Sequence, residues 1–213
     1  MDLWVARHRR RASGHISVIR YADDGVLCFE SQQEAKIWRE ALDARLQQFG
    51  LTLHPDKTQL IAFGTSAAKS LARSGQRCGT FHFLGFTHYM GKSFKGKWLV
   101  KRKTQRSRVV RSLKRIRREL MGSRLHDPIS KTGAWLRSVV QGHINYYAVP
   151  LNYRSISVFV WEVIKGWLKA LRRRSQRSKM LWSRFSRVVK QWIPRVRIIH
   201  PYPNQRFDAK YSR

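Results

Sequence analysis

The sequence predicts an α+β fold in which antiparallel strands and one helix come first and basic helices follow. Three observations predict this fold. Apolar and polar side chains alternate on either side of a tight turn in residues 15–29, as in paired strands. Later segments place apolar side chains three and four residues apart, as in helices. Residues 1–94 contain 13 basic and 8 acidic side chains, whereas residues 95–213 contain 31 and 4.

The charge and composition indicate a polyanionic partner. The 213 residues include 44 Lys and Arg against 12 Asp and Glu, a net charge of +32. A compact chain with this charge repels itself unless a polyanion is present, and 42% hydrophobic residues are enough for a folded core. We therefore expect nucleic acid as the partner, with an acidic membrane surface as the weaker alternative. The step in charge predicts two domains, 1–94 and 95–213.

Several protein classes do not fit this sequence. The two cysteines are too few for a disulfide scaffold or a four-cysteine zinc module. The sequence has no apolar run of transmembrane length and no secretory signal at its start. We therefore expect no membrane partner and a cytoplasmic location of the bacterial type, with an organelle as the alternative.

The first part reads as a hairpin followed by a helix. Residues 15–21 form a strand with Ile16, Val18 and Arg20 on one face, residues 22–25 a turn, and residues 26–29 a second strand. The Asp-Gly pair in the turn is a strong hairpin signal. Ser31 with Glu34 three residues later has the spacing of a helix capping box. Helical spacing of apolar residues then continues to Gly50, which ends the helix.

The remaining segments follow in order. Residues 51–63 read as a short strand pair around a turn at 55–57, residues 64–80 as a loop and residues 81–89 as a strand. Four helices are expected in the second part, at about 101–120, 130–147, 152–174 and 178–192. The first of them has an apolar stripe of Val109, Leu113, Ile116 and Leu120 among many basic residues.

Asp23 and Asp24 are adjacent carboxylates in a chain short of acid. Two neighbouring carboxylates repel each other unless a cation joins them. Mg²⁺ is the natural cation, because proteins hold it through one or two carboxylates together with substrate phosphates. The alternative is an ordinary Asp-Gly hairpin turn.

The segments around these carboxylates resemble reverse transcriptases. The run YADD at residues 21–24, between two apolar strands, is similar to the catalytic hairpin of that family. The run GLTLHPDKT at residues 50–58 resembles the next palm motif, and FHFLGF at residues 81–86 resembles the primer-grip hairpin. GHINYY at residues 142–147, LRRRSQRS at residues 171–178 and HPYP at residues 200–203 resemble the maturase domain of group II intron-encoded proteins.

The resemblance implies a fold and a set of roles. The fold would be a partial reverse-transcriptase palm, of antiparallel strands plus a helix, followed by an α-helical thumb and maturase domain. Asp23 and Asp24 would bind Mg²⁺ as catalytic carboxylates, and Lys57 would lie near the triphosphate. The residues beside the primer and the incoming nucleotide would be Tyr21, Ala22, Phe83, Leu84 and Gly85.

The basic helices predict an RNA surface. Group II intron RNA is the expected partner, with a DNA primer or target in the full-length enzyme. The predicted contacts are two dense basic runs on helices, with tryptophans and tyrosines between them that could stack on bases. These basic residues are Lys101, Arg102, Lys103, Arg106, Arg108, Arg111, Arg172, Arg173, Arg174 and Arg177.

One departure from the family pattern affects the expected activity. Reverse transcriptases of this type have a further aspartate on an earlier palm strand, and Asp2 is the one acid before Asp23. We therefore expect these residues alone to be inactive as a polymerase, with the fingers and first palm half supplied by another chain. The alternatives are a non-enzymatic maturase-type RNA-binding protein, a decayed fragment and, more distantly, a basic ribosomal component.

Overall fold

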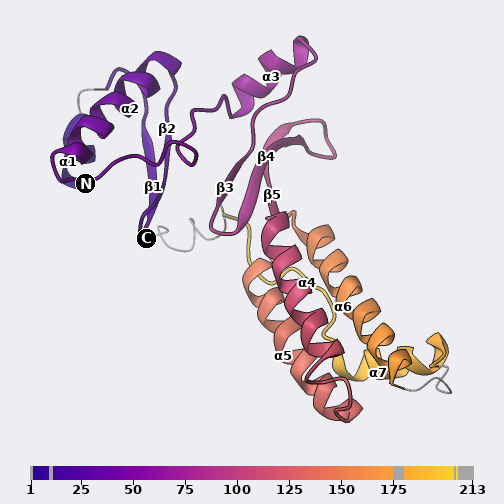
Figure 1. Cartoon of the computed structure of the whole chain (residues 1–213). Coiled ribbons are helices and arrows are strands. Elements are labelled where there is room, and N and C mark those ends of the chain that lie inside the picture. The colour runs from indigo at the N-terminus through magenta and orange to yellow at the C-terminus, as the bar shows by residue number, and fades with distance from the viewer. Residues whose placement is uncertain (1, 10–11, 175–179, 204, 206–213) are drawn as a thin grey trace. The chain divides into compact units, whose positions relative to one another are not determined.

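A computed structural model describes residues 2–9, 12–174, 180–203 and 205 (Figure 1). The chain divides into two compact units, which we describe separately. The first unit comprises Met1–Phe83 and Tyr89–Val100, and the second comprises Leu84–His88 and Lys101–Arg213.

The element order confirms the predicted α+β class. A two-stranded antiparallel sheet, β1-β2, and a three-stranded sheet of order β3-β4-β5 precede the long helices. The elements are α1 (Asp2–Arg9), β1 (Ser17–Tyr21), β2 (Asp24–Cys28), α2 (Gln32–Gln47), α3 (Thr65–Arg73), β3 (Phe81–Phe83), β4 (Phe86–Lys92), β5 (Trp98–Thr104), α4 (Arg106–Met121), α5 (Ile129–Tyr147), α6 (Tyr153–Arg173) and α7 (Trp182–Trp192).

The first unit has a small core where the β1-β2 hairpin meets α2. Ile16 is 1% exposed and packs with Trp38 of α2, which is 6% exposed. The predicted inward face is confirmed for Ile16 and Val18, whereas Arg20, predicted on the same face, is exposed; Val18 is directly opposite Leu27, and both pack against this core. Burying these side chains fixes which face of the hairpin meets the helix.

Ser31 caps α2 as predicted, but the carboxylate of Glu34 bonds to the chain before β1 instead of completing a capping box. Ser31 has an extended backbone, and its hydroxyl accepts a hydrogen bond from the backbone N–H of Glu34 at 3.5 Å. The carboxylate of Glu34 accepts a bond from the backbone of Ser13 at 3.1 Å, so it ties the chain before β1 to the helix. The helix ends at Gln47 rather than at the predicted Gly50, which closes the following turn with a positive φ of 67°, a conformation that glycine adopts without strain.

The predicted position of the hairpin turn was wrong. The turn comprises Ala22 and Asp23, and Asp24 and Gly25 belong to β2, where they pair with Tyr21 and Arg20. With this register Val18 lies opposite Leu27. A turn two residues later would place Leu27 opposite Ala22 instead. Apolar cross-strand pairing therefore outweighs the local Asp-Gly signal.

Two further predictions for the first unit were wrong. Residues 51–63 contain no strand, only a turn at 55–57. A strand needs a partner to pair with, and the β1-β2 sheet has two strands. Residues 64–80 contain α3 rather than a loop throughout, because Ala and Leu favour a helix there and Ala68 is buried to 3% exposure.

The second unit is built on α4 to α7, at positions close to those predicted. The stripe on α4 is confirmed: Ile116 and Leu120 are each 1% exposed, with Val109 and Leu113 packed beside them. Trp167 of α6 is fully buried at the centre of the same core. The apolar stripes therefore account for how the four helices bury their inner faces.

The start of α4 differs from the prediction. The helix begins at Arg106, and the preceding Lys101, Arg102 and Lys103 lie on strand β5. Thr104, the last residue of β5, is 5% exposed, and its backbone N–H donates to the side-chain oxygen of Asn152 at 3.0 Å. A helix through residue 104 would direct that N–H to a carbonyl one turn earlier, so the bond to Asn152 marks the change from strand to helix.

Asn152 joins three segments of the second unit. It is 1% exposed and precedes α6. Its side-chain nitrogen donates to the hydroxyl of Thr104 and to the backbone oxygen of Tyr147, each at 2.9 Å. With the bond from the Thr104 backbone, this one amide satisfies groups at the end of β5, the end of α5 and the start of α6.

Replacing Asn152 should therefore destabilise the second unit strongly. In Asn152→Ala the backbone N–H and the hydroxyl of Thr104 lose a buried partner, at a cost of about 1–3 kcal/mol for each unsatisfied group, whereas the oxygen of Tyr147 keeps the N–H of Val149. We expect the free energy of unfolding, measured in urea, to fall by about 2–4 kcal/mol. The exposed Asn145→Ala is the matched control, with an expected change below about 0.5 kcal/mol. Equal stability of the two variants would contradict this role.

Candidate functional site

The two adjacent aspartates lie at the end of the β1-β2 hairpin. Asp23 is in the turn and Asp24 is the first residue of β2, opposite Tyr21. All four residues from Tyr21 to Asp24 are exposed. Ala22 has a positive φ of 53°, which is uncommon for a residue other than glycine, so the turn holds its backbone in a restricted conformation.

The surroundings of Asp23 and Asp24 leave both carboxylates available. Neither has a hydrogen bond or an ion pair among the described residues. No group of three His, Cys, Asp or Glu that could hold a metal ion occurs in that part of the chain. Two exposed carboxylates fit Mg²⁺ binding of the kind that one or two acids share with substrate phosphates. They are too few for a site made of protein ligands alone.

Lys57 lies in a different turn from the two aspartates. It is exposed in the turn at residues 55–57, where its backbone N–H donates to the oxygen of His54 at 3.2 Å. The described contacts include none between Lys57 and either aspartate. The structure therefore gives Lys57 a defined backbone but no specific partner for its ammonium group.

A second hairpin turn, at Leu84 and Gly85, is part of the helical unit. Both residues have positive φ, 48° and 77°, as a two-residue turn requires. The oxygen of Leu84 accepts a hydrogen bond from the hydroxyl of Tyr146 at 3.1 Å, and the oxygen of Gly85 accepts one from the N–H of Gln105 at 2.9 Å. Phe83 precedes this turn at the end of β3 and is half-buried.

Aromatic packing reinforces this turn. Phe86 is 8% exposed, and its ring centre lies 6.1 Å from that of Tyr146, nearly parallel to it, and 5.2 Å from that of Tyr147. A Cβ atom at Gly85 would lie 2.9 Å from the hydroxyl of Tyr147. Residues 84–86 are therefore held against the last turn of α5 by hydrogen bonds, ring contacts and close approach.

His143, in the same part of α5, is a packing residue. Its ring is stacked on Phe159 at 3.7 Å between centres and lies 4.6 Å from Tyr147. Burial lowers the pKa of His143 to about 4, so it is neutral at physiological pH. Burial also raises the pKa of the Tyr147 hydroxyl. Both groups suit a core that positions Tyr146 rather than proton transfer.

The segment around His200 is attached to the same end of α5. A ring nitrogen of His200 lies 2.7 Å from the backbone oxygen of Asn145, and the N–H of Ile199 donates to Ala148 at 3.1 Å. The GHINYY and HPYP runs, which are far apart in the sequence, are thus neighbours in the second unit.

The predicted RNA-binding residues lie on three elements. Strand β5 carries Lys101 and Arg102, which are half-buried, and Lys103, which is exposed. Helix α4 carries Arg106, Arg108 and Arg111, which are all exposed. At the end of α6, Arg172 and Arg173 are exposed and Arg174 is half-buried. Arg177 lies outside the described residues. Arg172 donates to the backbone oxygen of Met180 at 3.1 Å, so it also has a structural contact.

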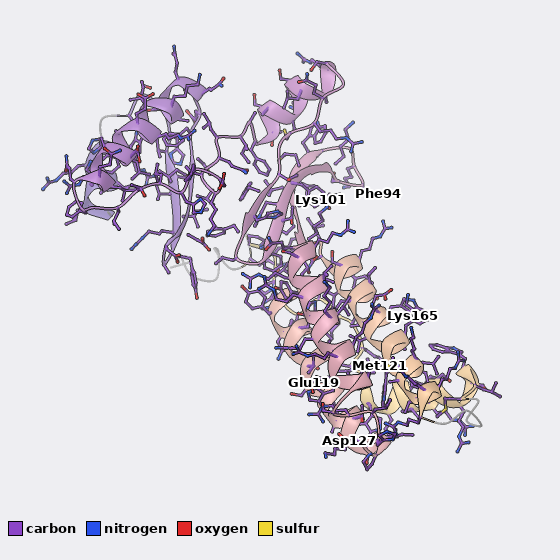
Figure 2. All side chains as sticks on the ribbon, viewed as in Figure 1. Phe94, Lys101, Glu119, Met121, Asp127 and Lys165 are labelled. Atoms are coloured by element: carbon purple, nitrogen blue, oxygen red, sulfur yellow. The ribbon has the colours of Figure 1, made fainter. Side chains whose placement is uncertain are left out.

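Acidic side chains of the second unit are concentrated away from the start of α4. The described residues of this unit contain Glu119, Asp127 and Glu162, and each pairs with a cation. Figure 2 shows Glu119 and Asp127 where α4 leads into α5, at the opposite end of α4 from Lys101. The first turns of α4 therefore present positive charge that no neighbouring acid neutralises.

A shallow groove of about 490 Å³ follows the exposed side of α5. It is open to solvent and is lined by Ala134, Arg137, Ser138, Gln141, Gly142 and Asn145. Enclosed apolar walls, which small-molecule sites usually have, are missing from this groove.

The sequence did not identify Thr104, Asn152 or the Tyr146 hydroxyl as structural contacts of this region. The signal available was weak, because each is a common polar residue at the predicted end of an element. Their importance comes from contacts across 48 and 62 residues of sequence, which local patterns do not contain.

These observations describe a strongly basic chain with an exposed pair of carboxylates on a hairpin. In a comparison with protein families, the model of the reverse transcriptase (RNA-dependent DNA polymerase) family matches residues 1–88 of the 213. Members of this family bind nucleic acid and generally use Mg²⁺. No curated protein matches the chain. Within the described residues, no helix is long and apolar enough to cross a membrane.

Substitution of Gly85 tests the contact between this turn and α5. Gly85→Ala places a Cβ against the Tyr147 hydroxyl and forces a positive φ on alanine. We expect a loss of about 1–3 kcal/mol in the free energy of unfolding. Adding Tyr147→Phe should recover part of the loss, because it removes the hydroxyl but not the backbone strain. Gly96→Ala, also at positive φ but with open space around it, is the control and should show the strain alone. Equal losses in Gly85→Ala and Gly96→Ala would contradict the close contact.

Proposed function

We propose that these residues form the end of the palm, the thumb and the maturase domain of a group II intron reverse transcriptase/maturase. In the whole protein the activity would be RNA-directed DNA synthesis by two-metal nucleotidyl transfer. The helical unit would bind the intron RNA and assist its splicing. The partners would be that RNA and, in the full-length enzyme, a DNA primer or target.

The observation that supports this proposal most is the attachment of residues 84–86 to α5. The primer-grip-like run and the maturase-like GHINYY run are distant in sequence, yet Tyr146 donates a hydrogen bond to Leu84 and stacks on Phe86. A domain that holds a primer-binding turn and binds RNA would need such a contact, because it fixes one nucleic-acid surface relative to the other.

The proposed roles of the hairpin residues follow from their positions. Asp23 and Asp24 would provide carboxylate oxygens for Mg²⁺, and Tyr21 and Ala22 would lie beside the primer end and the incoming nucleotide. Lys57 would act near the triphosphate as a charge or proton donor. Mg²⁺, when bound, would supply charge stabilisation for phosphoryl transfer.

The primer-side contacts would come from the second hairpin. Phe83, Leu84 and Gly85 would hold the primer backbone. The positive φ of Leu84 and Gly85 leaves a compact turn that a sugar-phosphate backbone can approach closely.

The proposed RNA surface is the acid-free side of the helical unit. Exposed Arg106, Arg108 and Arg111 on α4 would bind phosphates, together with the other basic residues of β5 and α6. Phosphate contacts of this kind give affinity that depends on salt and little on base sequence.

Polymerase activity is not expected from these 213 residues alone. Two carboxylates are fewer than the three that reverse transcriptases of this type use, and Asp2 on α1 is the one earlier acid. A further carboxylate from outside these residues would complete the site. The second candidate function is a non-enzymatic RNA-binding protein, which the exposed Arg106, Arg108 and Arg111 would serve without the two carboxylates.

Intron RNA binding and primer extension test the proposal together. We expect the purified chain to bind group II intron RNA with an affinity that falls on the order of 10³-fold between about 50 and 200 mM salt, which corresponds to about six phosphate contacts. Asp23→Asn with Asp24→Asn should leave this affinity within about twofold, because the substitutions lie outside the basic surface. Neither protein should extend a primer with Mg²⁺. Extension by the unmodified chain that the double variant loses would contradict the expected inactivity.

A matched pair of triple variants tests the location of the RNA surface. Changing Arg106, Arg108 and Arg111 to Gln should reduce the slope of log K against log salt by about three, because three phosphate contacts are lost. Changing Arg117, Arg124 and Lys131 to Gln removes the same charge, but these cations are paired with Glu162, Glu119 and Asp127 and should contribute less. Equal effects of the two triple variants would contradict the proposed surface.

A further inference from the structure

Two tryptophans of the helical unit are exposed to solvent and touch each other. Trp161 of α6 is 48% exposed and Trp182 of α7 is 45% exposed. Their ring centres are 5.6 Å apart with an angle of 68° between the planes. Large rings exposed in this way leave apolar surface in contact with water, which marks an interaction site more often than a structural one.

The exposed pair is anchored in the core of the unit. Trp182 contacts Phe185 at 5.8 Å, and Phe185 contacts Trp167 at 5.5 Å. Phe185 and Trp167 are both 0% exposed. The four rings thus form a continuous series from the core to the surface, so the outer rings are held in place before any ligand binds.

A hydrogen bond between the end of α6 and the segment just before α7 adds to this rigidity. Arg172, near the end of α6, donates to the backbone oxygen of Met180, two residues before α7 begins. A preorganised aromatic surface loses little conformational entropy on binding, which favours affinity.

The geometry of the pair leaves ring surface available. Because the planes are at 68°, one indole presents its edge to the other, so the faces of that indole are not covered by its partner. A flat aromatic ligand can stack on such a face, and every nucleobase is a ligand of this kind.

Positive charge surrounds Trp161 along α6. Arg154, Val158, Trp161, Lys165 and Lys169 are separated by four, three, four and four residues, so they lie on one side of the helix, and all are exposed. Lys165 is visible on α6 in Figure 2. The neighbouring acid, Glu162, is already paired with Arg117 at 3.4 Å and with Lys165.

This combination favours one occupant. An apolar protein partner or a second copy of the chain would meet the cations at Arg154, Lys165 and Lys169, and a second copy would bring like charges together. A polynucleotide strand supplies both of the required groups, bases for the rings and phosphates for the lysines. In a duplex the base faces are covered by stacking, so the strand must contain unpaired nucleotides.

We propose that Trp161 and Trp182 form a stacking platform for unpaired nucleotides of RNA, with Lys165 and Lys169 contacting the adjacent phosphates. The inference rests on the proposed function, in which the helical unit binds RNA. It adds a specific site at which single-stranded segments of that RNA are distinguished from duplex.

Affinity for single-stranded and duplex RNA tests the platform in the full chain. The probes are a labelled oligoadenylate and a blunt RNA duplex of equal length, measured by fluorescence anisotropy at one salt concentration. In Trp161→Ala with Trp182→Ala we expect binding of oligoadenylate to weaken about tenfold or more, in line with the loss of one stacked base. Binding of the duplex should change less than about twofold.

Two variants separate stacking from apolar contact and from misfolding. Trp161→Phe with Trp182→Phe keeps flat rings and should retain most of the oligoadenylate affinity. Val158→Ala removes exposed apolar surface on the same side of α6 without removing a ring, and it should bind like the unmodified chain. Circular dichroism of each variant checks that the helices are intact.

The outcomes distinguish this inference from the proposed function. If the double alanine variant loses affinity for oligoadenylate and duplex equally, or keeps its affinity for both, the proposed stacking platform is wrong. RNA binding by the helical unit would still stand. If the unmodified chain binds no RNA at all, the proposed function fails. An equal loss for the DNA version of the oligonucleotide would overturn the assignment to RNA. A change in oligomeric state without a change in RNA affinity would indicate a second copy as the occupant.

Discussion

The buried side chain of Asn152 holds the helical unit together at the point where strand changes to helix. Its amide bonds to Thr104 and Tyr147 connect the end of β5, the end of α5 and the start of α6. The next residue after Thr104, Gln105, donates to Gly85, and Tyr146 donates to Leu84. Asn152 therefore fixes the two segments from which Gln105 and Tyr146 hold the second hairpin turn, and a buried amide that lost its partners would be costly.

Charge sets the other main constraint on this protein. With a net charge of +32, the chain has few acids with which to neutralise its own surface. In the described helical unit, the acids Glu119, Asp127 and Glu162 are all used in local ion pairs. Such exposed pairs contribute little to stability. Apolar burial around Trp167 must therefore hold the helices together, and most of the positive charge of the unit is not neutralised by its described acids.

The helices were predictable from sequence because their signal is local. The stripe from Val109 to Leu120 and the stripe through Leu136, Val140 and Ile144 each determine a buried face by spacing alone. The register of the first hairpin was harder to predict from the sequence, because it depends on Val18 lying opposite Leu27 rather than on the Asp-Gly pair. Residues 51–63 illustrate the same limit, since a strand pattern produces no strand where no neighbour pairs with it.

For the candidate site, the sequence identified the exposed aspartates and most of the basic residues, but not how the turn at Leu84 and Gly85 is held. That attachment depends on contacts between residues that are 62 and 20 positions apart. The apolar neighbours of Trp167 predicted a core position, which its 0% exposure confirms, whereas nothing in the sequence predicted that Trp161 is exposed.

Amide hydrogen exchange at Thr104 and Gln105 tests the central claim most directly. The N–H of Thr104 donates to Asn152 and that of Gln105 donates to Gly85, so both should exchange only when the helical unit unfolds. We predict protection equal to that of the buried Leu136 and Val140 amides in α5. Exchange as fast as that of the exposed turn at residues 55–57 would show that the second hairpin is not fixed to the helices, and would contradict the account.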